Sequence, residues 1–118
     1  MTFKAILALL VAACAYLLIG VADVPRVQFV RPPFVIRESE MVVLQIRVEP
    51  DSENRKLVVA AIDGEFVVAR TEEDLPGPRT RWVRMRLPAG ELLLVAVLLD
   101  THGEVERDTH RLTVRGWP

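Results

Sequence analysis

The chain has 118 residues, which is enough for one domain and a short appendage but not for a second hydrophobic core. Its 15 basic and 16 acidic residues leave a net charge of −1, so no overall field attracts it to nucleic acid or to an anionic membrane. The single cysteine, Cys14, lies in an apolar segment, so a domain built from the rest of the chain must be stabilised by packing rather than by a disulfide.

An apolar segment without any charge, residues 5–22, follows Lys4. A helix of about 18 to 20 apolar residues is long enough to cross the hydrocarbon core of a bilayer. Lys4 is expected to hold the N-terminal end in the cytoplasm, which places Asp23 and everything after it on the far side of the membrane. The chain is therefore predicted to be extracytoplasmic: periplasmic, displayed at the cell surface, or secreted.

Three fates of residues 1–22 are open. The small residues Gly20 and Ala22 fit a signal peptide that is cleaved after Ala22. If the segment is retained, residues 1–22 are instead an N-terminal membrane anchor. Residues 11–14 resemble a bacterial lipobox, in which Cys14 would be lipidated, although Cys14 also fits an ordinary apolar helix as a small side chain.

Residues 23–33 are expected to form a proline-containing linker or edge segment. Within it, residues 27–30 have the composition of a strand that could continue past the proline pair at 32–33 as residues 34–36. A proline cannot donate to a ladder of hydrogen bonds, so this strand is predicted to lie at the boundary of a sheet, where the chain could switch between sheets. Residues 41–48 alternate and predict a strand with one core face.

The next two predicted strands, residues 56–62 and 66–69, flank Asp63 and Gly64. An Asp-Gly pair between apolar runs favours a hairpin with a type I′ turn, which needs positive φ at both central residues. Residues 71–78 begin with acidic side chains and end with Pro and Gly, so we expect a loop there.

Residues 80–87 alternate between apolar and polar side chains. One side of this strand would carry Trp82, Arg84 and Arg86, and exposed Trp and Arg are typical of the residues that dominate binding at protein interfaces. These three residues are therefore candidate partner-binding residues. The competing interpretation is that Trp82 lies in a second core face or beneath the aliphatic parts of the two arginines.

Residues 92–99 form an uninterrupted apolar run. Its short length and the flanking Pro and Gly favour a central strand over a buried helix. After a turn at residues 100–103 the chain is expected to return as a strand over residues 105–114. The predicted fold class is all-β: a single seven-stranded sandwich over residues 34–116, preceded by an N-terminal hydrophobic helix.

The corner at residues 87–92, followed by the apolar run and Gly103, resembles the corner and last hairpin of fibronectin type III-like and immunoglobulin-like domains. The resemblance covers about residues 80–115. The sequence departs from that pattern at Leu92, which stands where the family has a tyrosine. The resemblance implies an immunoglobulin-like or fibronectin type III-like sandwich that serves as a spacer or binding module, and it supplies no catalytic residues.

The sequence predicts no catalytic, cofactor or metal site, and the chain is not expected to be an enzyme. Ser39 and Ser52 lie in polar contexts outside any nucleophile turn. His102 has no acidic or cysteine neighbour at a convincing ligand spacing. Asp108 and His110 are two residues apart on a predicted strand and are expected to pair at the surface, but no nucleophile accompanies them.

These observations favour an exported or membrane-anchored domain that acts as a protein-interaction or structural accessory module of the cell envelope. Its partner is expected to be an envelope protein, and residues 5–22 would contact the membrane if they are not cleaved. The alternative is an extracytoplasmic carbohydrate- or ligand-binding module, which would need exposed aromatic rings.

Overall fold

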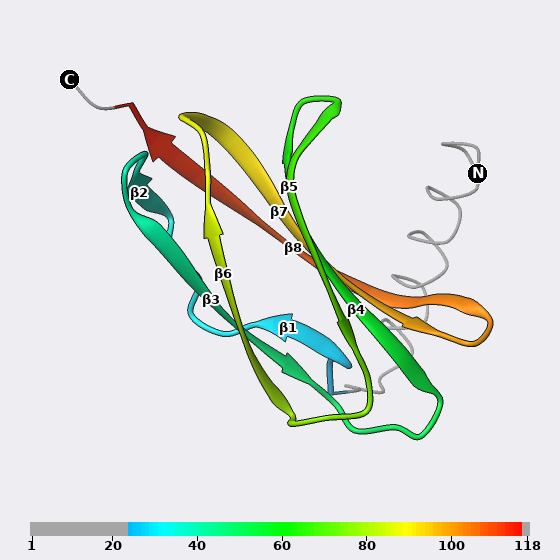
Figure 1. Ribbon diagram of the computed structural model, residues 1–118. Coiled ribbons are helices and arrows are strands. Elements are labelled where there is room, and N and C mark those ends of the chain that lie inside the picture. The colour runs from blue at the N-terminus through cyan, green and yellow to red at the C-terminus, as the bar shows by residue number, and fades with distance from the viewer. Residues whose placement is uncertain (1–23, 117–118) are drawn as a thin grey trace, which may run out of the picture.

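The computed structural model describes residues 24–116, which form eight β-strands in two sheets with a sandwich-like arrangement (Figure 1). The strands are β1 (Val27–Phe29), β2 (Val35–Arg37), β3 (Met41–Val48), β4 (Asn54–Asp63), β5 (Phe66–Asp74), β6 (Thr80–Arg86), β7 (Gly90–Asp100) and β8 (Gly103–Arg115). None of these described residues forms a helix that could cross a membrane. The expected N-terminal helix, the lipidation site at Cys14 and the cleavage site after Ala22 lie outside the described residues.

One sheet has the order β1-β3-β6 and the other has the order β2-β8-β7-β4-β5. All pairs are antiparallel except β2 with β8, which is parallel. The expectation of seven strands is wrong by one, because the segment around the proline pair forms two strands in different sheets. As predicted, both strands lie at sheet edges and the chain switches sheets between them, at Arg31, Pro32 and Pro33.

The core lies between the two sheets and is built from alternate residues of their strands. On β3, Val42, Leu44 and Ile46 point inward and are almost fully buried, as the alternation of residues 41–48 predicts. The apolar run at residues 92–99 is confirmed as a central strand, because β7 lies between β8 and β4. The apolar side chains that are buried in this core belong to six strands and to the two segments on either side of β6: Val27, Phe29, Val42, Leu44, Ile46, Val48, Leu57, Val59, Ala61, Leu75, Val83, Met85, Leu87, Leu92, Leu94, Ala96, Leu98, Leu112 and Val114.

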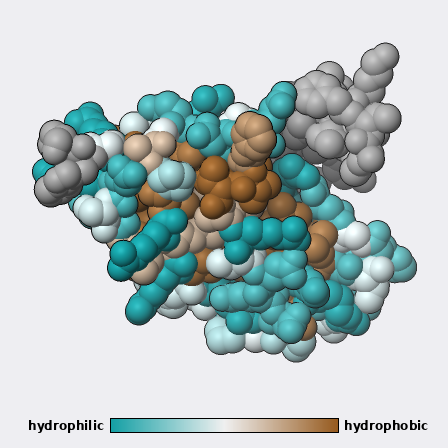
Figure 2. All heavy atoms as spheres, turned by 45° about the horizontal axis from the view of Figure 1, so that its top comes forward, coloured by the Kyte–Doolittle hydropathy of each residue, from teal (hydrophilic) through white to brown (hydrophobic). Residues whose placement is uncertain are grey.

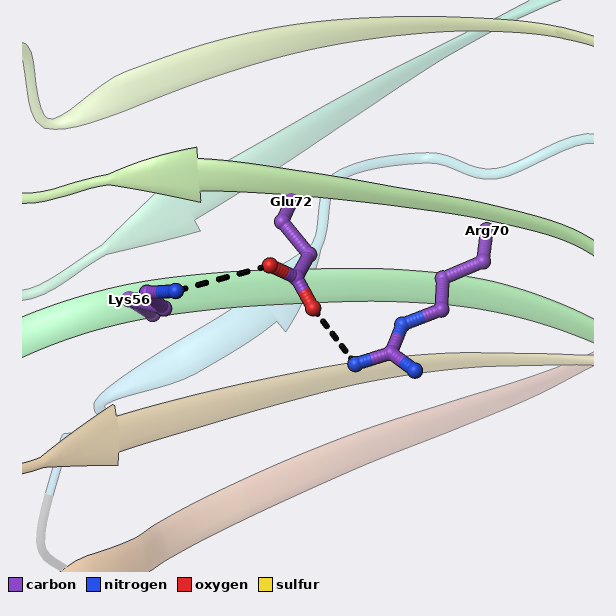
Figure 3. A network of polar contacts seen from close by, with 3 residues as sticks. All are labelled: Lys56, Arg70 and Glu72. Carbon is purple, nitrogen blue, oxygen red and sulfur yellow. Dashed lines mark hydrogen bonds and ion pairs between the residues drawn. The ribbon is translucent and has the colours of Figure 1, made fainter.

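The sequence predicts a loop over residues 71–78, but this prediction is wrong for residues 71–74, which form the second half of β5. They pair with the beginning of β4, where Lys56 lies opposite Asp74 and Val58 opposite Glu72. Lys56 Nζ and Arg70 Nη2 lie 3.5 and 2.5 Å from the two carboxylate oxygens of Glu72 (Figure 3). Acidic residues are poor strand formers, but these cross-strand charges compensate for that preference at an edge strand.

The hairpin between β4 and β5 is confirmed, but its turn is displaced by one residue. Asp63 pairs with Phe66, so the two-residue loop consists of Gly64 and Glu65. Gly64 has a φ of 59°, whereas Glu65 is not among the residues with positive φ. A two-residue loop whose first residue is a glycine, and in which only that residue has positive φ, is typical of a type II′ turn. The type I′ turn that the sequence predicts is therefore wrong.

Candidate docking surface

The outer face of the three-stranded sheet carries the three candidate partner-binding residues. Val83 and Met85 of β6 point into the core, so Trp82, Arg84 and Arg86 point outward between and beside them. Trp82 is 61% exposed, which contradicts the interpretation that it belongs to a second core face or lies beneath the arginines. A large ring held at this exposure on a rigid strand is available to a partner without rearrangement of the backbone.

The neighbouring strand β3 extends this surface with apolar side chains. Met41 lies opposite Arg86 and Val43 lies opposite Arg84, and both are nearly half exposed. We call the surface formed by Met41, Val43, Trp82, Arg84 and Arg86 the tryptophan–arginine face. Its combination of aromatic, aliphatic and guanidinium groups has the composition of the centre of a protein interface.

The charge of this surface differs from that of the chain as a whole. Arg47 lies on the same outward side of β3 as Val43 and Gln45. The outer face of the three-stranded sheet therefore carries three arginines on β3 and β6, namely Arg47, Arg84 and Arg86. No outward-facing residue of β3 or β6 is acidic. Neither Arg84 nor Arg86 lies within ion-pair distance of a carboxylate in residues 24–116. A nearly neutral chain therefore presents a locally basic surface.

The main chain of β6 is open along the edge of the three-stranded sheet, beside the tryptophan–arginine face. In an antiparallel pair, residues whose N–H and C=O bond to the neighbouring strand alternate with residues whose groups point away from it. Val48 N donates to Arg79 O at 2.8 Å, just before β6 begins. Continued along the register, this places the main-chain groups of Trp82, Arg84 and Arg86 on the side away from β3. Within residues 24–116 no other strand lies on that side, because β6 ends the sheet.

The outer face of the five-stranded sheet is built differently. Val58 and Val95 are more than nine-tenths buried although they lie outside the core between the sheets. The ion pairs of Lys56, Glu72 and Arg70 lie over this face, and the Arg70 side chain extends from β5 across β4 (Figure 3). Long charged side chains cover apolar surface with their aliphatic parts, so this sheet shields its apolar residues from solvent.

Large apolar side chains are also exposed at several places away from β6. A space-filling view shows apolar side chains gathered in the middle of one face of the molecule, with hydrophilic side chains along its borders (Figure 2). Among the described aromatic rings, Phe34 and Phe66 are more exposed than Trp82, at 73% and 74%. They lie at the start of β2 and at the β4–β5 turn, on elements of the other sheet. Neither belongs to the tryptophan–arginine face.

Asp108 and His110 do not form the expected surface pair. His110 Nε2 lies 2.7 Å from Pro33 O and donates to it, and the imidazole ring packs against Phe34 with a centroid distance of 4.9 Å. Asp108 Oδ2 instead accepts a hydrogen bond from Phe29 N at 2.8 Å. Both side chains hold the segment around β1 and the proline pair against β8, which is a structural role.

Two carboxylates of β8 complete the edge of β1, an arrangement that the sequence analysis missed. Glu106 Oε2 accepts a hydrogen bond from Val27 N at 3.0 Å, and Asp108 does the same for Phe29. These N–H groups point away from β3, because the main chain of β1 bonds to β3 through the intervening residues, as in the bond from Val30 N to Gln45 O. We call Glu106 and Asp108 the carboxylate latch. Acidic residues two apart on a strand were its only sequence signal.

The loop between β3 and β4 borders a hollow of about 310 Å³, together with Leu75 and residues 76–78. Asp51 Oδ1 accepts from Glu53 N at 2.9 Å, and the buried Asn54 amide donates to Glu49 O at 3.0 Å. The side chains of Asp51 and Asn54 thus bond within the loop itself. In residues 24–116 no three His, Cys, Asp or Glu side chains are placed to hold a metal ion.

Comparisons with protein-family models, with curated proteins and with solved structures find no match to this chain. The tryptophan–arginine face must therefore be interpreted from its own geometry and chemistry.

Proposed function

We propose that this chain is an exported or membrane-anchored, extracytoplasmic domain that acts as a protein-interaction or structural accessory module of the cell envelope. Its docking surface in this proposal is the tryptophan–arginine face. The observation that carries the proposal is the exposure of Trp82 beside two arginines that have no ion-pair partner among the described residues. In the same part of the chain, the main chain of their strand is open on one side.

Trp82 is expected to make the largest single contribution to binding. A tryptophan side chain buries roughly 150 to 250 Å² in an interface, and Trp82 has 61% of its surface still exposed. Covering that surface would contribute about 3 kcal/mol at about 25 cal/mol per Å². A few residues of this kind dominate the affinity of most protein interfaces, and neighbouring arginines add charge-assisted hydrogen bonds.

Location and fold subtype belong to the same proposal. The apolar segment of residues 5–22 after Lys4 supports export, with cleavage after Ala22, retention as an anchor, or lipidation at Cys14 as its alternatives. An immunoglobulin-like or fibronectin type III-like subtype is supported by two mainly antiparallel sheets and by the corner that joins β6 to β7.

A carbohydrate-binding module is the second candidate, because an exposed indole can stack on a sugar ring. Trp82 is the one aromatic side chain among the outward-facing residues of β3 and β6, whereas Arg47, Arg84 and Arg86 supply charge. This balance favours a protein partner. A glycan array probed with the full chain separates the two functions, since saturable sugar binding that W82A abolishes would establish the second one.

The proposed function is tested by photo-crosslinking in intact cells that make the full chain. Trp82 is replaced by a photo-crosslinking amino acid, and the matched control carries the same group at Arg111, which is exposed on β8 of the other sheet. We expect a discrete protein adduct from position 82 and none from position 111. Equal adducts from both positions, or none from either, would contradict the docking surface.

Location is tested separately with S39C, because Ser39 is exposed in the turn between β2 and β3. A membrane-impermeant maleimide added to spheroplasts is expected to label this residue without lysis. Labelling that appears only after lysis would place the domain in the cytoplasm and refute the extracytoplasmic part of the proposal.

A further inference from the structure

We propose that the partner binds through an extended acidic segment that adds as a strand to the open edge of β6, a deepening that rests on the function proposed above. Main-chain hydrogen bonds would come from Trp82, Arg84 and Arg86, whose N–H and C=O groups point away from β3. The side chains of the same three residues would recognise the side chains of the added strand. Strand addition of this kind derives affinity from the main chain and specificity from alternate side chains.

The side chains specify the pattern of the added strand. Residues directly opposite in neighbouring strands lie within contact distance on the same face of the sheet. An added strand therefore places alternate residues next to Trp82, Arg84 and Arg86. Carboxylates opposite the two arginines and an apolar side chain opposite Trp82 match these groups, and the intervening residues turn toward the core side, where Val83 and Met85 lie. The expected segment therefore carries acidic residues at two alternate positions, opposite Arg84 and Arg86, and apolar residues at the others.

The other three edge strands of the described sheets are less suited to accept a strand. The outward N–H groups of Val27 and Phe29 on β1 already bond to the carboxylate latch. β2 has three residues. β5 ends in three consecutive acidic residues, 72–74, which would repel an acidic segment. β6 is the edge in this part of the chain that combines an open main chain with unpaired positive charge.

A second copy of this chain is a poor occupant of the same edge. Two β6 strands paired with each other would bring the arginines of one copy close to those of the other, and like charges in cross-strand positions are destabilising. Charged residues on an edge strand commonly prevent this kind of self-association. The same arginines that disfavour a second copy attract a segment of opposite charge.

The test uses a synthetic peptide of Glu and Val, about as long as β6, with Glu only at the two positions that would lie opposite Arg84 and Arg86, and the full chain in detergent micelles. The substitution W117F leaves Trp82 as the sole tryptophan, so its emission reports on the face. We expect saturable binding with a blue shift of Trp82 emission. A peptide in which Lys replaces Glu should bind about tenfold more weakly, because two exposed ion pairs are replaced by like-charge contacts.

The main-chain and side-chain contributions are separated with matched variants. N-methylation of the peptide at every second residue removes the donors that face β6 in one register, and methylation of the other set removes the donors that face solvent. We expect methylation of the set that faces β6 to weaken binding by about tenfold or more, and methylation of the set that faces solvent to leave binding unchanged. The double variant R84E/R86E should prefer the Lys peptide, whereas R111E on the other sheet should bind as the unsubstituted chain does.

Several results would overturn this inference. Equal binding of both N-methylated peptides would show that side chains alone are recognised, without strand addition. Arginine-dependent binding to phosphatidylglycerol vesicles with no binding of the Glu peptide would assign the face to a lipid surface. A specific adduct at position 82 with no peptide binding refutes strand addition but leaves the proposed function standing, whereas loss of both refutes the two together.

Discussion

The carboxylate latch makes the stability of the sandwich depend on two side chains of β8 that accept hydrogen bonds from the main chain of β1. Asp108 on β8 accepts a hydrogen bond from Phe29 N on β1, across the gap between the two sheets. β1 has three residues, and Phe29 is one of its two buried side chains. We predict that D108A loosens β1 from the sandwich and lowers the free energy of unfolding.

The magnitude follows from what the substitution leaves behind. The hydrogen bond is part-buried and has a charged acceptor, so its loss leaves the Phe29 N–H without an acceptor and costs about 1.5 to 3 kcal/mol. For a domain of this size each kcal/mol lowers the melting temperature by roughly 4 to 8 °C. D108N keeps an acceptor oxygen without the charge, so its loss should be smaller, about 1 kcal/mol.

Two measurements on the full chain check this prediction. Urea denaturation followed by fluorescence gives the free energy of unfolding, and hydrogen exchange reports on the N–H groups of β1. The matched control is E104A on the same strand. Glu104 pairs with Arg107 and raises the pKa of that guanidinium above its usual value, but both side chains are about 40% exposed. Solvent screening should keep the control's loss below about 1 kcal/mol.

The reasoning is refuted if D108A and E104A lower the free energy of unfolding equally. It is also refuted if D108A is destabilising while exchange at Phe29 keeps its original rate, because the loss would then arise elsewhere than at the edge of β1.

Three further substitutions test other parts of the fold by the same denaturation assay. L94A removes a side chain with no exposed surface from β7 and should cost about 2 to 5 kcal/mol, and a loss below 1 kcal/mol would show that the core collapses around the gap. G64A should cost about 1 to 2 kcal/mol from the positive φ alone, since an added Cβ meets no atom within 4 Å, and an unchanged stability would argue against the turn geometry. H110A loses the bond to Pro33 O and should cost about 1 to 2 kcal/mol, whereas W82A should stay within about 0.5 kcal/mol because its ring is exposed.

Alternation along single strands was readable from the sequence. The inward side of β3 and the placement of Trp82, Arg84 and Arg86 together on one side of β6 follow from a two-residue period, which each segment carries within itself. The sequence left open whether that side of β6 is exposed, and the structure shows that it is. The central position of β7 was also predictable, because a strand with two covered faces has to be apolar at every position. The proline pair indicated the switch between sheets, since proline cannot donate within a ladder.

What the sequence could not disclose was the identity of neighbours from distant parts of the chain. The local preferences of residues 71–74 favour a loop, whereas Lys56 on β4 supplies the charge and the ladder that hold them in β5. The spacing of Asp108 and His110 predicts that they pair with each other, although the hydrogen bond of Asp108 goes to Phe29, 79 residues away. Local periodicity determines which side of a strand is apolar, but the hydrogen-bond partners of an edge depend on which strands lie beside it. For that reason the buried face of β6 was determined by the sequence alone, and its open edge only by the packing of the two sheets.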